Sequence, residues 1–232
     1  SSTATLQNKC DGAYRMSPTG RPRILIADDH TFVAEACVKM LEPEFDVVGT
    51  VGDGQALLAA VPELKPDIIV LDVGMPLLNG LEAGKRIKKM VRAVRIVYVT
   101  MNTDLGLAAE AFRNGASGYL LKTSAASELV MAVREVLKGK RYLSPLVAKD
   151  ADAFFLETRL SHMGQEILTN RQREVLQLLA EGRSMKETAY ALKLTPRTVV
   201  FHKYKIMERL RLRTNAELVQ YAIREHVILP RS

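Results

Sequence analysis

The chain has 232 residues, of which 47% are hydrophobic and 25% are charged, and it contains only two cysteines. This length exceeds one typical domain and allows two modest hydrophobic cores. No apolar run approaches the roughly 18 to 20 residues of a membrane-spanning helix, and residues 1–22 lack the continuous apolar core of a secretory signal. We therefore expect no membrane association, and the sparse cysteines favour a reducing cytoplasm.

The formal net charge of +7 is distributed unevenly along the chain. Residues 166–232 contain 13 Lys or Arg against 7 Asp or Glu, so they carry +6 of the total. A basic segment suits a polyanionic partner such as nucleic acid, although a basic helical face is often only solvated. The charge thus indicates a separate C-terminal unit.

Four short apolar runs in the first part of the chain are typical of β-strands. They are Arg23–Ala27, Asp67–Leu71, Arg95–Val99 and Tyr119–Leu121. Segments of helical length separate them, which predicts a parallel α/β sheet. In such sheets the functional groups gather at the carboxyl ends of the strands.

Polar residues follow these runs at the expected sheet edge. They are Asp28, Asp29, Asp72, Thr100 and Lys122. Three carboxylates in one crevice repel one another unless a cation neutralises them, and Mg²⁺ prefers such oxygen ligands. Asp72 could then attack a phosphoryl group to give an aspartyl-phosphate, while Lys122 and Thr100 contact phosphoryl oxygens. Taken singly, each of these residues is also a common turn, cap or solvated residue.

The segments around these residues resemble the receiver domain of bacterial two-component response regulators. The matching segments are 24–30, 67–76 with 79–80, 97–100 and 115–122. The resemblance implies a doubly wound, flavodoxin-like α/β fold with a five-stranded parallel sheet.

The resemblance also implies roles for individual residues. Asp72 is the implied phosphoacceptor, and Thr100 and Lys122 are implied to contact the phosphoryl group. The implied Mg²⁺ ligands all offer carboxylate or carbonyl oxygens, and they are Asp28, Asp29, Asp72 and Gly74. We further expect phosphorylation to move Thr100 and Tyr119 and so to shift a two-state equilibrium. Met101 follows Thr100 where receivers usually have a small residue, so access to the phosphoryl group is expected to be crowded.

Helix-capping signals dominate the C-terminal segment. Thr169, Ser184 and Thr214 are each followed three residues later by Gln or Glu, and Thr195 precedes a proline that suits the first helical position. These signals predict four helices. The expected ranges are 169–182, 184–191, 195–210 and 214–226, with a tight turn between the second and third. This pattern is typical of a helix-turn-helix unit.

Residues 168–176, 181–189 and 195–202 look like the LuxR-type DNA-binding domain. A receiver followed by this domain is the NarL/FixJ architecture, and the resemblance covers about residues 21–229. It implies a transcription regulator rather than an enzyme, with double-stranded DNA and a sensor histidine kinase as partners. The expected parts of the chain are a flexible tail (1–21), a receiver (22–143), a linker (144–165) and a small all-α DNA-binding domain (166–232).

The third of these helices is expected to bind DNA. The candidate contacts are Thr195, Arg197, Thr198, Val200, Phe201, Lys203, Tyr204 and Lys205. Cationic and hydroxyl side chains near the start of a helix suit phosphates. By resemblance, Val200, Phe201 and Tyr204 face the major groove, where an apolar pair could contact thymine methyl groups. A place for Phe201 partly in the hydrophobic core is the alternative.

The fourth helix carries more apolar surface than one small core needs. Leu218, Val219 and Ala222 are the candidate dimerisation residues, because this helix commonly pairs two DNA-binding domains in the family. A homodimer on DNA would read two half-sites about one helical turn apart. Core packing alone would explain the same residues.

The predicted function is therefore a response regulator in which Mg²⁺-dependent phosphorylation of Asp72 controls sequence-specific DNA binding. One alternative is a DNA-binding protein that needs no phosphorylation and whose receiver serves only for dimerisation or docking. A phosphohydrolase of the haloacid-dehalogenase kind is disfavoured, because such an enzyme needs a second acid where Gly74 stands.

Overall fold

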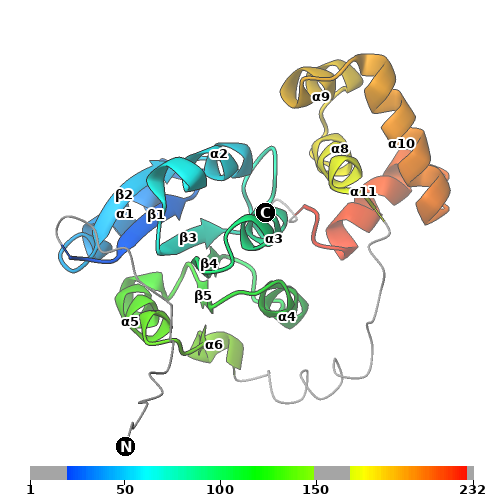
Figure 1. Cartoon of the computed structure of the whole chain (residues 1–232). Helices are drawn as coiled ribbons and strands as arrows, with labels where there is room; N and C mark the ends of the chain where they lie inside the picture. The colour runs from blue at the N-terminus through cyan, green and yellow to red at the C-terminus, as the bar shows by residue number, and fades with distance from the viewer. Residues whose placement is uncertain (1–19, 149–167, 229–232) are drawn as a thin grey trace, which may run out of the picture.

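The structure is a computed structural model that describes residues 20–148 and 168–228 (Figure 1). Nearly all of the expected tail, and the expected linker from residue 149 on, lie outside the described residues.

The first domain contains a parallel sheet with the strand order β2-β1-β3-β4-β5-β6. The strands are β1 (Arg23–Ala27), β2 (Asp46–Val51), β3 (Ile68–Asp72), β4 (Arg95–Thr100), β5 (Gly118–Leu121) and β6 (Tyr142–Leu143). The predicted parallel α/β sheet is confirmed, but the predicted strand number of five is wrong. The sixth strand has two residues and extends the β5 edge, where the Tyr142 N–H donates to the Ser117 carbonyl at 3.0 Å. So short a strand has no hydrophobic periodicity to reveal it.

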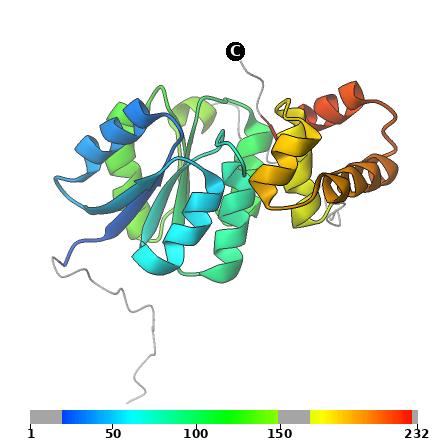
Figure 2. The same ribbon diagram turned by 90° about the horizontal axis from the view of Figure 1, so that it is seen from above.

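Helices cover both faces of this sheet (Figure 2). They are α1 (Thr31–Leu41), α2 (Gly54–Leu64), α3 (Gly80–Met90), α4 (Leu105–Arg113) and α5 (Ala125–Leu137), followed by the four-residue α6 (Pro145–Ala148). Buried residues of α2, α3 and α4 pack on one face, and those of α1 and α5 pack on the other. The sheet is therefore buried on both faces, which explains its nearly continuous apolar strands.

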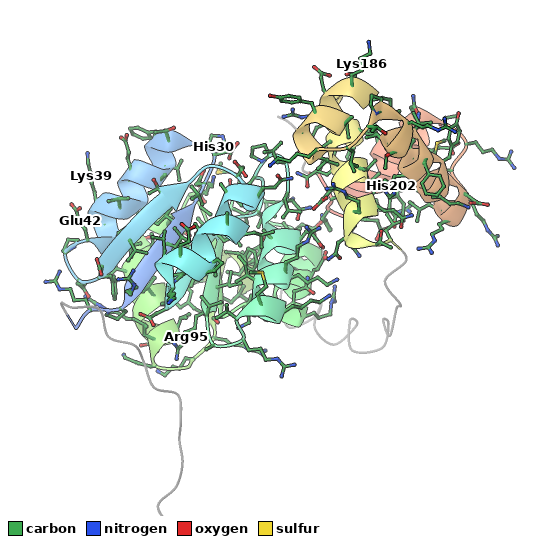
Figure 3. All side chains as sticks on the ribbon, turned by 45° about the horizontal axis from the view of Figure 1, so that its top comes forward. His30, Lys39, Glu42, Arg95, Lys186 and His202 are labelled. Atoms are coloured by element: carbon green, nitrogen blue, oxygen red, sulfur yellow. The ribbon has the colours of Figure 1, made fainter. Side chains whose placement is uncertain are left out.

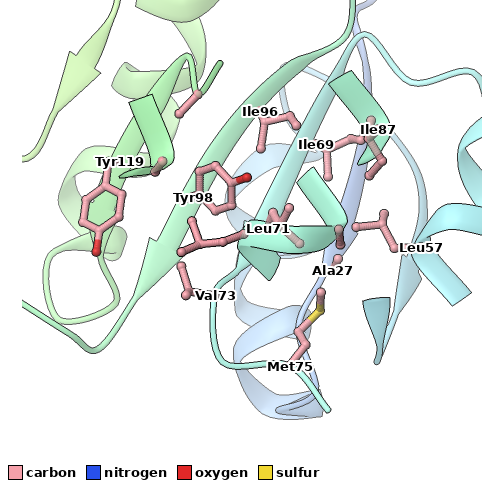
Figure 4. Close-up of a cluster of buried hydrophobic side chains, with 14 of the residues drawn as sticks. Ala27, Leu57, Ile69, Leu71, Val73, Met75, Ile87, Ile96, Tyr98 and Tyr119 are labelled. Atoms are coloured by element: carbon pink, nitrogen blue, oxygen red, sulfur yellow. The ribbon is translucent and has the colours of Figure 1, made fainter. Parts of the chain in front are cut away.

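Successive side chains of a strand point to opposite faces of the sheet, so the receiver core has two parts. Ile69 and Leu71 of β3 belong to the cluster beneath α2 and α3, where Tyr98 is also buried (Figure 4). Ile68 and Val70 of the same strand face α1 and α5. These four apolar side chains of β3 are at most 3% exposed, so the strand that ends in Asp72 is packed tightly on both sides.

Helix α3 begins directly against the end of β3. A Cβ atom added to Gly80 would lie 2.0 Å from the Asp72 carbonyl oxygen, so only glycine permits this approach. The Asn79 side chain caps the helix by accepting from the Glu82 N–H at 2.8 Å. The loop between Asp72 and Gly80 is thereby fixed at its α3 end.

The second domain contains four helices, as predicted. They are α8 (Asn170–Ala180), α9 (Met185–Leu192), α10 (Pro196–Leu210) and α11 (Asn215–Arg224). Complete capping boxes begin α8 at Thr169 and α9 at Ser184, and Pro196 is the first residue of α10. The Thr214 hydroxyl caps α11, but its partner Glu217 accepts from the Arg213 N–H instead of completing a box.

The two domains are in contact through α8 and the segment after α11. The Asn79 side-chain amide donates to the Val227 carbonyl at 2.8 Å, and Arg86 of α3 pairs with Glu174 of α8 at 2.6 Å. Helix α10 lies on the side of the second domain away from the receiver (Figures 1 and 2). In this arrangement the receiver leaves α10 uncovered.

Candidate functional site

The three carboxylates predicted for the pocket lie together at the carboxyl edge of the sheet. Asp28 and Asp29 follow β1, and Asp72 ends β3. Ligand atoms of these residues and of His30 all lie within 4.8 Å of one another. Asp28 and Asp72 are only 7% and 5% exposed, whereas Asp29 faces the solvent. Neighbouring parallel strands end at one edge, which explains why residues 44 positions apart meet.

Lys122 joins two of these carboxylates. Its Nζ atom lies 2.8 Å from Asp28 Oδ2 and 2.8 Å from Asp72 Oδ2. Burial alone would lower the pKa of Lys122, but the attraction of Asp72 and Asp28 outweighs it and raises this pKa. The ammonium group therefore stays charged in the pocket.

Asp72 has the opposite balance of effects. Burial raises its pKa, and the neighbouring Lys122 ammonium offsets this rise only in part. The pKa of Asp72 is therefore above its ordinary value. A buried carboxylate with a raised pKa is a more basic oxygen nucleophile than a solvated one, provided that it is ionised.

Thr100 and Tyr119 are linked through Asn102. The Thr100 hydroxyl accepts from the Asn102 N–H at 3.1 Å, and the Tyr119 hydroxyl donates to the Asn102 carbonyl at 3.4 Å. Both Thr100 and Tyr119 are fully buried. Met101, which follows Thr100, is 67% exposed and is one of the residues that line the cleft above Asp72.

The residues present fit a divalent metal ion. Asp28, Asp29 and Asp72 supply hard oxygen donors of the kind that Mg²⁺ prefers. The Gly74 N–H donates to Asp72 Oδ1 at 3.1 Å, which places residue 74 beside the acidic cluster. His30, which sequence reasoning missed as a pocket residue, has its Nδ1 atom 3.0 Å from Asp29 Oδ1.

The second domain forms part of the wall of this pocket. A cleft of about 780 Å³ opens above Asp72. Its lining includes Asp29, His30 and Lys122 from the receiver and Glu181, Arg183 and Glu187 from the loop between α8 and α9 and the start of α9. The sequence carries no signal for this second wall, because it depends on how the two domains meet.

The predicted DNA-binding residues lie on an exposed helix. Val200, Phe201 and Tyr204 are 36%, 58% and 68% exposed, whereas Val199 and Ile206 are buried on the inner face of α10. The hydrophobic cluster of the second domain and the side chains packed against it do not include Phe201, so the alternative of a partial place in the core was wrong. Of the other candidates, Thr195, Arg197 and Lys205 are exposed, and Thr198 and Lys203 are half-buried. Figure 3 labels the half-buried His202 of the same helix.

The candidate dimerisation residues are mostly buried within their own domain. Leu218 and Ala222 belong to the core of the four helices, at 2% and 0% exposure, and Val219 is half-buried. Core packing thus accounts for Leu218 and Ala222. Ile223, at 37% exposed, is the large apolar side chain that α11 presents to the solvent within the described residues.

A carboxylate pocket on a doubly wound sheet, joined to a helix-turn-helix domain, defines a DNA-binding response regulator. The sequence matches the response regulator receiver domain family over residues 24–134 and the bacterial regulatory proteins of the luxR family over residues 166–222. The chain belongs to the NarL/FixJ family of two-component response regulators and is a transcription factor rather than an enzyme. Among the described residues, no helix is both long and apolar enough to cross a membrane.

Relatives match along most of their length. The transcriptional regulatory protein LiaR of Bacillus subtilis is 34% identical over 213 residues, which are 89% of this chain and 99% of the relative. The oxygen regulatory protein NreC of Staphylococcus carnosus is 33% identical over 218 residues, with the same two shares. A solved structure of two RcsB dimers bound to two parallel DNAs has 27% identity and a TM-score of 0.54 and covers 87% of this chain and 97% of that one.

Proposed function

We propose that Asp72 accepts a phosphoryl group from a sensor histidine kinase, with Mg²⁺ in the pocket, and that this modification controls sequence-specific DNA binding. The observation that carries the proposal is the meeting of Asp28, Asp72 and Lys122, with both Nζ–carboxylate distances at 2.8 Å. Such a set can hold a cation, a nucleophile and a phosphoryl oxygen in one place.

Each side chain would have a separate task in the transfer. An Asp72 oxygen forms a bond to phosphorus as the bond to the donor's leaving group breaks, and the leaving group departs with the electron pair. Lys122 holds one phosphoryl oxygen, and the Thr100 hydroxyl bonds another. A bound Mg²⁺, held by Asp28, Asp29, Asp72 and the Gly74 carbonyl, would supply charge neutralisation for the carboxylates and the phosphoryl group.

The contacts of Thr100 suggest how the signal would leave the pocket. A Thr100 side chain that turns toward a phosphoryl oxygen weakens its bond to the Asn102 N–H, and Asn102 in turn holds the Tyr119 hydroxyl. Phosphorylation would therefore shift the equilibrium between two positions of Thr100 and Tyr119.

DNA binding would use the exposed face of α10. Lys203, Lys205 and Arg197 can neutralise phosphates, and Val200, Phe201 and Tyr204 can meet base edges. RcsB binds DNA as a dimer, and we extend this to a homodimer on DNA for the present chain, acting in the cytoplasm. Val219 and the exposed Ile223 are the α11 residues best placed to contribute.

The test is DNA affinity and oligomeric state before and after phosphorylation by acetyl phosphate that mass spectrometry has confirmed. We expect phosphorylation to raise the affinity for a selected DNA site at least about fivefold, the lower end of typical allosteric couplings. The Asp72→Asn variant should not respond. Identical affinity and oligomeric state in both forms would instead favour a regulator that binds DNA without phosphorylation.

A further inference from the structure

Gln177 of the DNA-binding domain reaches into the receiver. It lies on α8, is 2% exposed, and touches the loop that follows Asp72 at two points. Its Nε2 atom donates to the Met75 carbonyl at 3.2 Å, and its Oε1 atom accepts from the Asn79 N–H at 2.8 Å. One amide group therefore bridges both ends of the segment from residue 75 to residue 79.

The orientation of this amide group is itself fixed. Nε2 of Gln177 also donates to Glu181 Oε1 at 2.8 Å, one turn further along α8. Three hydrogen bonds thus satisfy a side chain that would be expensive to bury without partners. These bonds fix the orientation of the Gln177 side chain between the two domains.

The bridged loop also depends on the second domain at its centre. Leu77 has a φ of 66°, which is unusual for a residue other than glycine, and its side chain packs against the core of the DNA-binding domain. Among the described residues, Leu77 belongs to neither of the two hydrophobic clusters of the receiver. The loop conformation is therefore held by groups from both domains.

The same loop carries part of the metal site. Gly74 stands directly before Met75, and its N–H is bonded to Asp72 Oδ1 at 3.1 Å. At the other end, the Gly80 N–H donates to the Val73 carbonyl at 2.9 Å. A change in the path of residues 75–79 would therefore move the carbonyl group of residue 74 relative to the acidic cluster.

We infer that Gln177 is a positioning residue for the divalent metal site of the receiver. It acts through the Met75 carbonyl and the Asn79 N–H, which fix the loop that presents Gly74. This inference rests on the proposed function, because it requires that the pocket binds a divalent ion. Linkage then makes the effect reciprocal: docking of the DNA-binding domain changes metal affinity, and the bound metal changes docking by the same factor.

The expected loss of Mg²⁺ affinity can be scaled from metal sites in which a hydrogen-bond partner of a ligand is removed. Removing a group that hydrogen-bonds a metal ligand typically weakens metal affinity about 10- to 100-fold. Gln177 bonds residues beside the ligand rather than the ligand itself. We therefore expect a loss of about 3- to 10-fold, smaller than that range.

The experiment is a calorimetric titration of the full chain with Mg²⁺. Gln177→Met removes both hydrogen bonds to the receiver loop, together with the bond to Glu181, and nearly keeps the length of the side chain. Gln177→Glu keeps an acceptor for the Asn79 N–H but sets a carboxylate oxygen against the Met75 carbonyl and the Glu181 carboxylate, so it should also bind Mg²⁺ more weakly than wild type. Gln220→Met is the matched control, since Gln220 is an exposed glutamine of α11.

We expect Gln177→Met to bind Mg²⁺ more weakly than wild type and Gln220→Met to bind as wild type does. Small-angle X-ray scattering of the same samples reports whether the domains stay docked. Wild-type affinity in Gln177→Met, whether its domains are docked or separated, would overturn the inference and leave the proposed function standing. Failure of the wild-type chain itself to bind Mg²⁺ would overturn both. If Gln177→Met does not fold, the Mg²⁺ affinity of Gln177→Glu is compared with that of wild type instead.

Discussion

Arg86 of α3 and Glu174 of α8 form an ion pair, with 2.6 Å between the Arg86 Nη1 and Glu174 Oε1 atoms, that ties the receiver to the DNA-binding domain. Arg86 also bonds Glu82, and Glu174 also bonds Arg171. Arg171 in turn donates to the Leu192 carbonyl at 2.7 Å. Charged contacts therefore run from α3 to the end of α9, next to the turn that precedes α10.

Breaking this pair should separate the domains. Arg86 is 16% exposed and Glu174 is 9% exposed, so Arg86→Met leaves two poorly solvated carboxylates short of a cation: Glu82 loses Arg86, and Glu174 keeps only Arg171. Removal of one member of a buried pair is worth about 3–5 kcal/mol, and this partly exposed case should lie at or below the lower end. We expect a larger radius of gyration by small-angle scattering. Lys138→Met, which removes an exposed ion pair with Glu135, should leave the radius unchanged.

The double variant Arg86→Met/Glu174→Met provides the matching test of mechanism. It removes both members and so leaves no Glu174 carboxylate at the interface without Arg86. We expect its domains to be closer to the wild-type arrangement than those of Arg86→Met alone. Equal separation in both variants would contradict a role for the Glu174 charge that Arg86 balances.

Gly80→Ala should destabilise the receiver. The new Cβ atom would lie 2.0 Å from the Asp72 carbonyl oxygen. Neither atom can move away by rotation of a side chain, because the oxygen belongs to the backbone and the Cβ atom is bonded directly to it. Overpacking of this kind costs about 1–3 kcal/mol, occasionally more, and denaturant unfolding measures it. Gly52→Ala is the control, because no atom lies within 4 Å of its added Cβ. A Gly80→Ala protein as stable as Gly52→Ala would show that α3 does not begin so close to β3.

The raised pKa of Asp72 predicts that ionisation of this carboxyl destabilises the folded chain in a pH-dependent way. Burial raises this pKa in the folded state, with Lys122 opposing the rise. Ionisation is therefore less favourable in the folded chain than in the unfolded one. The resulting loss of stability is complete above the folded pKa and disappears below the unfolded pKa of about 3.9.

Asp72→Asn should accordingly raise the melting temperature at pH 7 in the presence of EDTA. The gain should shrink as the pH falls toward 4, because the wild-type carboxyl is then protonated as well. Thermal unfolding of both proteins across this pH range makes the comparison. A variant that is less stable than wild type at pH 7, by an amount that shrinks as the pH falls below the unfolded pKa, would show that the Lys122 ion pair outweighs burial.

Phosphate and base contacts on α10 should respond differently to substitution. Lys203→Ala should weaken binding to all DNA sequences and reduce the slope of log affinity against log salt by about 1. Val200→Ala or Tyr204→Ala should instead change sequence preference, by about 1–3 kcal/mol at the contacted position. Lys39→Ala, on α1 of the receiver, is the control for loss of charge alone. Equal losses on every sequence for all three α10 variants would contradict these roles.

The pocket could be predicted from the sequence because its position follows from the geometry of parallel sheets. Parallel strands end at a common edge, so Asp28, Asp72 and Lys122 must meet once the strands are recognised. The capping residues Thr169 and Ser184 likewise depend only on neighbours three residues away. Local signals of this kind are readable without a structure.

Contacts between the domains could not be predicted in this way. Gln177 meets Asn79 across 98 positions of sequence, and a polar residue within an amphipathic helix ordinarily predicts a solvated face. Leu77 adopts a left-handed backbone conformation, which the sequence usually signals with a glycine, and this position has none. The apolar residues Leu218 and Ala222 were ambiguous for another reason, since core and dimer surfaces use the same side chains.

The most direct test of phosphorylation at Asp72 is the intact mass of the full chain after incubation with Mg²⁺ and acetyl phosphate. The wild-type protein should gain one phosphoryl group, and neither a sample with EDTA in place of Mg²⁺ nor the Asp72→Asn variant should gain it. A folded wild-type chain without the increment, or an increment that persists in Asp72→Asn, would contradict the assignment of Asp72 as phosphoacceptor.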